Sequence, residues 1–158
     1  MRLKKFTDYS LRVLIFLAAR PRQRATIAEI ANAFDISENH LMKVSHTLGK
    51  AGVLANIRGK GGGLELAMPP KAINVGHVVR LTEGALHPAE CFSTTGTCRI
   101  VRACYLRTVL DDAAQAFYAV LDRYTLEDIV RNRNALSRML ALPRPVRLVP
   151  RRSAMGEA

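Results

Sequence analysis

Three cysteines are the residues of this chain best suited to chemistry, and Cys91, Cys98 and Cys104 lie within one stretch of 14 residues. An odd number of cysteines so close together argues against a framework of structural disulfides. Zinc sites favour cysteines about two to four residues apart. Here six and five residues separate the three cysteines. Soft thiolates supplied from one loop suit an iron–sulfur cluster, which makes cluster binding the leading interpretation.

The cysteine stretch alone does not complete a ligand set. A cluster conventionally needs four protein ligands, so the fourth must be another residue type, a residue of a partner chain or an exogenous group. Two alternatives leave the thiols without metal: three unrelated cysteines, or a thiol sensor that peroxide oxidises. Arg99 and Arg102 lie beside the cysteines and favour thiolates electrostatically, which helps either ligation or reactivity.

The charge of the chain points to an anionic polymer as partner. The 158 residues carry a formal net charge of +11 and a pI near 10.3, and both nucleic acid and an acidic membrane surface satisfy that condition. The apolar run Val13–Ala19 is far shorter than the roughly 20 residues of a spanning helix. Asp8 and Arg12, which precede this run, are charged residues that a signal-peptide core would not contain. We therefore expect a cytoplasmic protein without a membrane partner, and the basic charge favours nucleic acid.

Short helices near the N-terminus predict a helix-turn-helix. A first helix is expected over Thr7–Ala19, with Thr7 as its N-cap. A second begins at Thr26, where Glu29 completes a capping box. Ser37 is expected to cap a third helix that ends before Gly52. Helices joined by so short a turn are typical of DNA-binding domains. The exposed candidates for DNA contact at the start of the third helix are Ser37, Glu38, Asn39, His40 and Lys43.

Two strand-like segments follow, over Val53–Ile57 and Leu64–Ala67, and a basic glycine-rich linker joins them. A strand pair of this kind directly after the third helix predicts a wing. Arg58, Gly59 and Lys60 at its tip are further candidates for DNA contact, because an arginine on a narrow loop suits a narrow minor groove. A phosphate-binding loop is the weak alternative, since the lysine is followed by glycine rather than Ser or Thr.

The C-terminal half predicts helices that hold two copies of the chain together. Asn74 can cap a helix over residues 75–83, and Thr125 with Asp128 caps a last short helix. A long helix over residues 103–123 carries an apolar stripe that would need a partner, so we expect a two-fold homodimer. That stripe consists of Leu106, Val109, Leu110, Ala113, Phe117, Val120, Leu121 and Tyr124.

The predicted elements divide the chain into four segments. We expect a winged helix-turn-helix DNA-binding domain over residues 1–84 and a cluster-binding cysteine loop over 85–104. Dimerisation helices follow over 105–142, and a flexible basic tail over 143–158. The fold class is therefore mainly α, with a two-stranded wing and a long C-terminal dimerisation helix.

Four motifs together resemble the iron–sulfur winged-helix repressor family of the NsrR, IscR and RirA type. They are the opening Met-Arg-Leu-Lys-Lys-Phe-Thr-Asp-Tyr-Ser-Leu-Arg, the segment Ser-Glu-Asn-His-Leu-Met-Lys-Val from residue 37, the Arg-Gly-Lys-Gly-Gly-Gly wing and the three-cysteine loop. The resemblance covers residues 1–142. It is strongest to the nitric-oxide-sensing NsrR branch. The cluster-assembly IscR branch has a histidine where this chain has Arg107, and the iron-responsive RirA branch shares the Ala-Glu-Cys-Phe run around Cys91.

The resemblance implies a homodimer with one cluster per subunit and a carboxylate as the fourth ligand. In proteins of the NsrR type that acid comes from the first helix of the other chain, which corresponds here to Asp8. The helix dipole alone would also favour an acid at that position. His87 and Glu90 are the adjacent competitors. A [4Fe-4S] cluster is slightly favoured over [2Fe-2S].

The resemblance implies transcriptional repression controlled by nitric oxide, with release from a pseudo-palindromic DNA operator when the cluster is attacked. The alternatives are an iron- or redox-responsive regulator of the RirA type and a cluster-free thiol sensor. An iron–sulfur electron carrier or redox enzyme would need a flavin, nicotinamide or partner-docking motif, and the sequence shows none. We therefore do not expect an enzyme.

Overall fold

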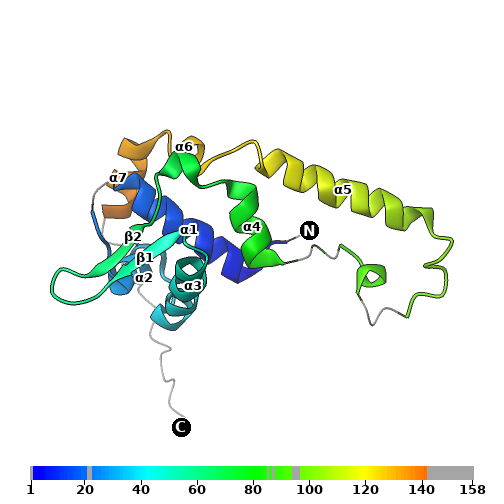
Figure 1. Cartoon of the computed structure of the whole chain (residues 1–158), viewed down its shortest axis with the longest axis horizontal. Coiled ribbons are helices and arrows are strands. Elements are labelled where there is room, and N and C mark those ends of the chain that lie inside the picture. The colour runs from blue at the N-terminus through cyan, green and yellow to red at the C-terminus, as the bar shows by residue number, and fades with distance from the viewer. Residues whose placement is uncertain (1, 21–22, 85, 87, 94–96, 142–158) are drawn as a thin grey trace, which may run out of the picture.

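The computed structural model describes residues 2–20, 23–84, 86, 88–93 and 97–141 (Figure 1). The expected basic tail over 143–158 lies outside the described residues. Most helices pack into one body, and a long helix with the cysteine loop beside it extends away from that body. None of the helices in the described part combines the length and the apolar character that crossing a bilayer requires.

Helix α1, Lys5–Ala19, runs through the middle of the body (Figure 1). Its residues Val13, Leu14 and Phe16 are buried, so this helix forms the centre of the main apolar core. The second helix, α2, spans Ile27–Phe34. The third, α3, spans Glu38–Lys50 and contacts both α1 and α2.

The connection between α2 and α3 is short because Asp35 adopts a left-handed conformation with φ 56°. Aspartate tolerates this region better than most side chains. The predicted capping box at the start of α2 is confirmed, since Thr26 and Glu29 exchange hydrogen bonds reciprocally. The two helices thus form the predicted helix-turn-helix.

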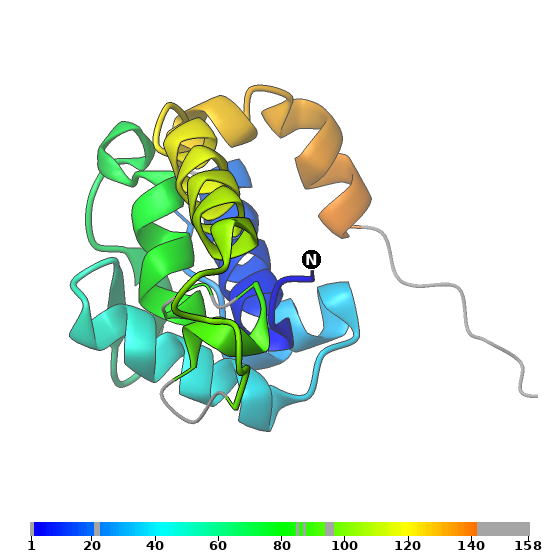
Figure 2. The same cartoon turned by 90° about the vertical axis from the view of Figure 1, so that its right-hand side faces the viewer.

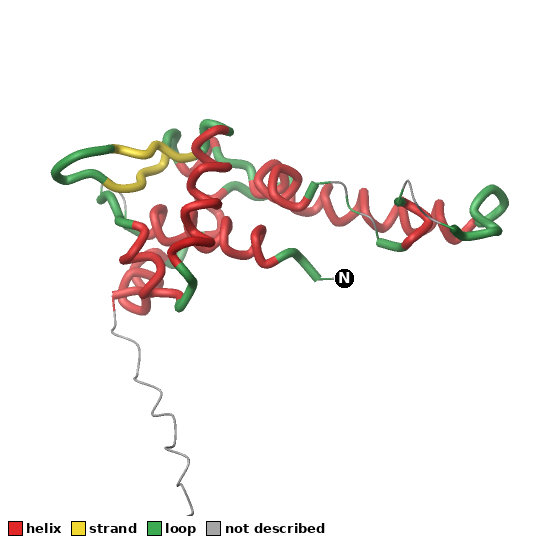
Figure 3. The backbone as a smooth tube through the Cα atoms, turned by 90° about the horizontal axis from the view of Figure 1, so that it is seen from below, coloured by secondary structure: helices red, strands yellow, loops and turns green. Residues whose placement is uncertain are grey.

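Strands β1, Leu54–Ile57, and β2, Gly63–Leu66, form an antiparallel pair in which Leu54 lies opposite Leu66. Ala25, which precedes α2, adds an antiparallel bridge to Leu64 on the outer side of β2. The hairpin between the strands projects from the end of the body opposite to the long helix (Figure 3). This is the predicted wing.

The remaining elements lead from the wing to the extended helix and back to the body. They are the 3-10 turn η1 (Pro70–Ala72), α4 (Val75–Glu83), the 3-10 turn η2 (Glu90–Phe92), α5 (Tyr105–Leu121), α6 (Leu126–Ile129) and α7 (Arg133–Ala141). Seen from the side of the cysteine loop, α5 points toward the viewer in front of α4 (Figure 2). A second apolar cluster, with Val75, Val79 and Tyr118 at its centre, joins α4 to the C-terminal half of α5.

Two local predictions were wrong, and one helix was missed. Helix α1 begins at Lys5, two residues before the predicted cap, because the Thr7 hydroxyl donates to the Glu83 carboxylate instead of capping the helix. Ser37 occupies the cap position of α3 but makes no side-chain capping hydrogen bond. Helix α7 was not predicted. It forms where Leu136 and Leu140 pack against the main core, and Ser137 donates to the Ala19 carbonyl at 2.8 Å.

Candidate DNA interface and cysteine loop

The first turns of α3 expose the polar side chains that the sequence singled out. Leu41, Val44 and Leu48 point into the core and are fully buried. Because one face of a helix is buried, the residues between these positions lie on the opposite face. The exposed residues of this face include Ser37, Glu38, Asn39, His40 and Lys43. A helix exposed in this way has the shape and the donors to enter a major groove.

The wing exposes Arg58, Gly59 and Lys60 at its tip. Its turn depends on glycine, since Gly59 has φ 90°. A Cβ atom on Gly62 would lie 2.4 Å from the Ile57 carbonyl oxygen. The tip therefore keeps a tight backbone path that side chains at these positions would obstruct.

Arg24 supports the wing from the body, a role that the sequence did not reveal. Its guanidinium donates to Glu65 Oε2 at 2.8 Å and to the Gly61 carbonyl at 3.3 Å. The neighbouring Ala25 exchanges backbone hydrogen bonds with Leu64 of β2. These contacts connect the segment before α2 to both the tip and the base of the hairpin, so the wing is held relative to the helix-turn-helix.

All three cysteines of the loop are free and half-buried. Cys91 lies in η2, Cys98 directly before a turn and Cys104 at the start of α5. Cys104 also lines a cavity of about 600 Å³ together with Phe92, Arg107 and other residues. The Arg107 guanidinium lies over the Phe92 ring, 5.5 Å from its centroid. Free thiols on an exposed loop retain the chemistry of metal ligands.

The single chain does not assemble a metal site from these thiols. Over the described ranges, no group of three or more His, Cys, Asp or Glu side chains is close enough to hold a metal ion. Glu90 instead accepts hydrogen bonds from Thr97, at 3.2 Å from the hydroxyl. His87 lies outside the described residues. The donor chemistry of the loop fits an iron–sulfur cluster, toward which the described residues of the loop offer three thiols.

Asp8 lies in the first turn of α1 and is paired with Arg12 one turn later. The Arg12 guanidinium nitrogens lie 3.1 and 2.9 Å from the two carboxylate oxygens. The Asp8 side chain remains 45% exposed, so it is accessible from outside the subunit. A group of a second chain could therefore reach the free lone pairs of this carboxylate while Arg12 holds its orientation.

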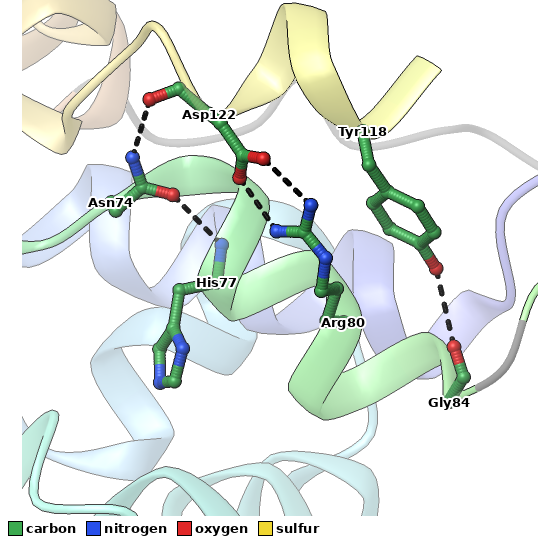
Figure 4. Close-up of polar contacts among 6 residues, drawn as sticks. All are labelled: Asn74, His77, Arg80, Gly84, Tyr118 and Asp122. Carbon is green, nitrogen blue, oxygen red and sulfur yellow. Dashed lines mark hydrogen bonds and ion pairs between the residues drawn. The ribbon is translucent and has the colours of Figure 1, made fainter. Parts of the chain in front are cut away.

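A polar junction that the sequence did not predict joins α4 to α5 (Figure 4). Arg80 donates to both carboxylate oxygens of Asp122 at 2.6 Å, and its guanidinium stacks 4.5 Å from the Tyr118 ring centroid. The Tyr118 hydroxyl donates to the Gly84 carbonyl at 3.2 Å. Asn74 donates to the Asp122 carbonyl at 2.7 Å. The junction thus fixes the C-terminal end of α5 against the helix that precedes the cysteine loop.

The ionisation of the junction follows from these contacts. The hydrogen bonds from Arg80 lower the pKa of Asp122, and the same bonds raise the pKa of Arg80. Burial raises the pKa of the Tyr118 phenol. Near neutral pH the pair is therefore fully ionised and the tyrosine remains a donor.

The N-terminal half of α5 leaves much of the predicted apolar stripe uncovered. Leu106 is 60% exposed and Val109 is 46% exposed, while only Ala114 and Tyr118 of this helix are buried. Such an exposed apolar surface marks an interaction site on most folded proteins. It lies on the part of the molecule that projects beyond the body (Figure 1).

Comparison with known proteins agrees with this fold. The model of the Rrf2 family, described as an iron-dependent transcriptional regulator, matches residues 3–132. The HTH-type transcriptional regulator NsrR of Bacillus subtilis (strain 168) is 49% identical over 144 residues, which are 90% of this chain and 99% of that protein. The NsrR regulator of Geobacillus kaustophilus (strain HTA426) is 46% identical over 142 residues, or 89% of this chain and 97% of the relative.

Solved structures give the same result. CymR (YrzC), the global cysteine regulator of B. subtilis, has a TM-score of 0.64 at 28% identity, covering 84% of this chain and 98% of that one. IscR of T. potens has a TM-score of 0.67 at 26% identity, covering 84% of this chain and 88% of that one.

The predicted fold class, a mainly α winged helix-turn-helix with a two-stranded wing, is confirmed. The molecule is a winged-helix transcriptional regulator. More specifically, the chain belongs to the Rrf2 family, and its curated relatives at 42–49% identity carry the name NsrR.

Proposed function

We propose that this chain is a dimeric DNA-binding repressor of the cytoplasm whose cysteine loop holds an iron–sulfur cluster that responds to nitric oxide. The observation that carries the proposal is the combination, in one chain, of a winged helix-turn-helix with a separate loop of three free thiols. The names of the curated relatives support the regulatory part of the proposal. A regulator built in this way can change its DNA affinity when the loop changes.

The DNA contacts divide between the two exposed surfaces. Asn39 and Lys43 on α3 have the donors that read adenine and guanine in a major groove. Ser37, Glu38 and His40 flank them at the start of the same helix. On the wing, Arg58, Gly59 and Lys60 approach the backbone or the minor groove, where positive charge is favoured. These residues supply both sequence readout and salt-dependent affinity.

Dimerisation would use the exposed apolar face of α5. Burial of Leu106 and Val109 against a second copy removes apolar surface from water, which is the main driving force for such interfaces. Two subunits related by a two-fold axis present two copies of α3, and two half-sites of an operator lie about 34 Å apart. A pseudo-palindromic operator follows from that symmetry.

The residues that would hold the cluster are Cys91, Cys98 and Cys104, with the partner subunit's Asp8 as the fourth ligand. A bound cluster supplies iron that nitric oxide can attack. Ligation by the thiolates would fix the conformation of the loop, and Arg12, which is paired with Asp8 in the same chain, would orient the carboxylate toward the cluster of the other subunit. A carboxylate would be a weaker ligand for such iron than a thiolate, so Asp8 would be the least tightly held member of this ligand set.

An iron-dependent response is the second candidate function, because the family description names iron dependence. In that case the loss of the cluster when iron is scarce, rather than its reaction with nitric oxide, would change the conformation of the loop. The same residues serve both functions. Comparing nitric oxide with an iron chelator on one DNA duplex distinguishes them.

The decisive test is anaerobic purification followed by absorbance near 400 nm, native mass spectrometry and a gel shift. The duplex is selected from a random-sequence library by the wild-type protein. We expect a dimer with one cluster per subunit and tighter DNA binding by the loaded form. Equal binding by the loaded and metal-free forms would contradict the proposal. The variant Asp8→Ala is expected to weaken cluster retention, and unchanged retention would remove Asp8 from the ligand set.

A further inference from the structure

Glu83 is a buried carboxylate that none of the roles above uses. Among the described residues it is the only charged side chain that is buried, with 9% of its surface exposed. It is the last residue of α4, and Gly84 follows it with φ 73°, at the point where the chain turns toward the cysteine loop. A buried charge is costly unless hydrogen bonds satisfy it, so its contacts indicate its role.

The Glu83 carboxylate caps helix α1 from α4. The Thr7 hydroxyl donates to Glu83 Oε2 at 2.5 Å, and the backbone N–H of Lys4 donates to the two carboxylate oxygens at 3.1 and 3.3 Å. The Lys4 ammonium also donates to the Glu83 carbonyl at 2.5 Å. Helix α1 has no capping side chain of its own. An anion at a helix N-terminus satisfies free amides and is stabilised by the helix dipole.

The turn that Glu83 caps connects directly to the DNA-reading helix. Thr7 is followed by Asp8, the candidate fourth ligand, and by Tyr9. The Tyr9 ring lies 5.9 Å from the imidazole of His40, centroid to centroid. His40 belongs to the exposed start of α3. A displacement of the first turn of α1 would therefore reach the recognition helix through one aromatic contact.

On its other side, α4 is fastened to α5 by the junction of Arg80 with Asp122 and of Tyr118 with Gly84 (Figure 4). The chain runs from the end of α4, whose last residue is Glu83, toward the cysteine loop and returns to the body along α5 (Figure 1). Leu86, at the beginning of the loop, packs into the apolar cluster between α4 and α5. A change of loop conformation thus acts first on the end of α4 that carries Glu83.

We propose that Glu83 is a positioning residue that transmits the conformation of the cysteine loop to the first turn of α1 and, through Tyr9 and His40, to the recognition helix. The proposal rests on the proposed function, since it assumes that the loop changes between two states. It assigns Glu83 a mechanical role rather than a ligand role: its carboxylate is already occupied by Thr7 and Lys4.

The first test measures hydrogen exchange in the metal-free full-length protein, and so depends neither on the cluster nor on DNA. In Glu83→Ala the amides of residues 4–12 should exchange about tenfold faster, because charge-assisted hydrogen bonds are lost. In Glu83→Gln exchange should stay near wild type, because one amide oxygen can accept from both Thr7 and Lys4. Glu127→Ala, at an exposed glutamate of α6, is the matched control. Unchanged exchange in Glu83→Ala would overturn the capping role.

The second test measures how far loading changes affinity for the selected duplex. The quantity compared is the dissociation constant of the metal-free protein divided by that of the protein loaded anaerobically with the cluster. In Glu83→Ala and in Thr7→Val this ratio should be about tenfold lower than in wild type, and so closer to one. Thr7→Ser and Glu83→Gln retain the hydrogen bonds and should retain the ratio. A wild-type ratio in both Glu83→Ala and Thr7→Val would overturn the proposal. If the wild-type ratio is itself one, the proposed function fails, and the exchange result still decides whether Glu83 holds α1.

Discussion

The ring of Tyr9 in α1 lies against the imidazole of His40 at the start of α3, with 5.9 Å between their centroids. The two residues are 31 positions apart in the sequence, and the contact connects the central helix of the core to the exposed face of the recognition helix. The orientation of that face therefore depends on a residue that itself need not touch DNA.

Replacing Tyr9 by alanine should weaken DNA binding without unfolding the protein. An aromatic pair contributes about 0.5–1.5 kcal/mol beyond burial. If this energy helps to orient α3 for binding, we expect a loss of affinity of about two- to thirteenfold in fluorescence anisotropy with the selected duplex. Tyr9→Phe keeps the ring and should bind like wild type. Wild-type affinity in Tyr9→Ala would show that the contact does not orient α3.

The basic tip of the wing predicts how DNA affinity depends on salt concentration. If Lys60 contacts a phosphate, Lys60→Gln should reduce the slope of log affinity against log salt by about 0.9. Asn39→Ala should instead relax the preference for the selected duplex over random DNA and leave the slope unchanged. Both slopes are obtained from titrations at several salt concentrations. An unchanged slope in Lys60→Gln would remove this lysine from the interface.

Gly62→Ala should distort the tip of the wing, because the added Cβ would lie 2.4 Å from the Ile57 carbonyl oxygen. We expect about tenfold weaker DNA binding with a small loss of thermal stability, since the core is untouched. Lys71→Ala, at an exposed residue of η1, serves as the control. Binding by Gly62→Ala equal to that of the control would contradict a structured wing.

The capping box of α6 predicts a pH dependence. The backbone amide and hydroxyl of Thr125, together with Arg131, lower the pKa of Asp128 to about 2. Since an unfolded aspartate titrates near 3.9, the Asp128 carboxylate stabilises the folded chain above about pH 4. This contribution is lost as the pH falls toward 2.

The stability difference between wild type and Asp128→Asn should therefore be largest near neutral pH and should shrink below about pH 4. Thermal melts over that range measure it, and carboxyl carbon shifts in NMR report the titration of Asp128 directly. A midpoint near 3.9 for Asp128 in the folded protein would show that the capping hydrogen bonds do not form.

The face of α5 predicts the oligomeric state. Val109→Asp places a charge in the expected interface and should shift sedimentation from dimer to monomer at micromolar concentration. Asp112→Asn, at an exposed position of the same helix, should leave the assembly unchanged. A dimeric Val109→Asp would locate the interface elsewhere.

Local sequence signals predicted much of this fold. The caps at Thr26, Asn74 and Thr125 are formed as expected, because each depends only on residues three positions away. The helical spacing of Leu41, Val44 and Leu48 correctly predicted that these side chains are buried, because this signal too is local in the sequence. Signals of this kind also located the exposed residues of the recognition helix and the wing.

Contacts between distant segments were not predictable in the same way. Thr7 was interpreted as a cap, yet its hydroxyl donates to Glu83, which lies 76 positions later. The pairing of Arg80 with Asp122 spans 42 positions. Helix α7 is nine residues long, too short to be stable alone, and it forms where it packs on α1, so its stability comes from tertiary contact.

The bare apolar face of α5 has a consequence for the amount of regulator in a cell. If two copies pair through this face, as proposed, a single unpaired subunit displays the kind of surface that chaperones and proteases engage. Newly made chains would then escape degradation only by pairing. The rate of pairing depends on the square of their concentration. The abundance of the regulator would respond to its rate of synthesis more steeply than in direct proportion, which sets a lower limit on the expression that yields a working pool.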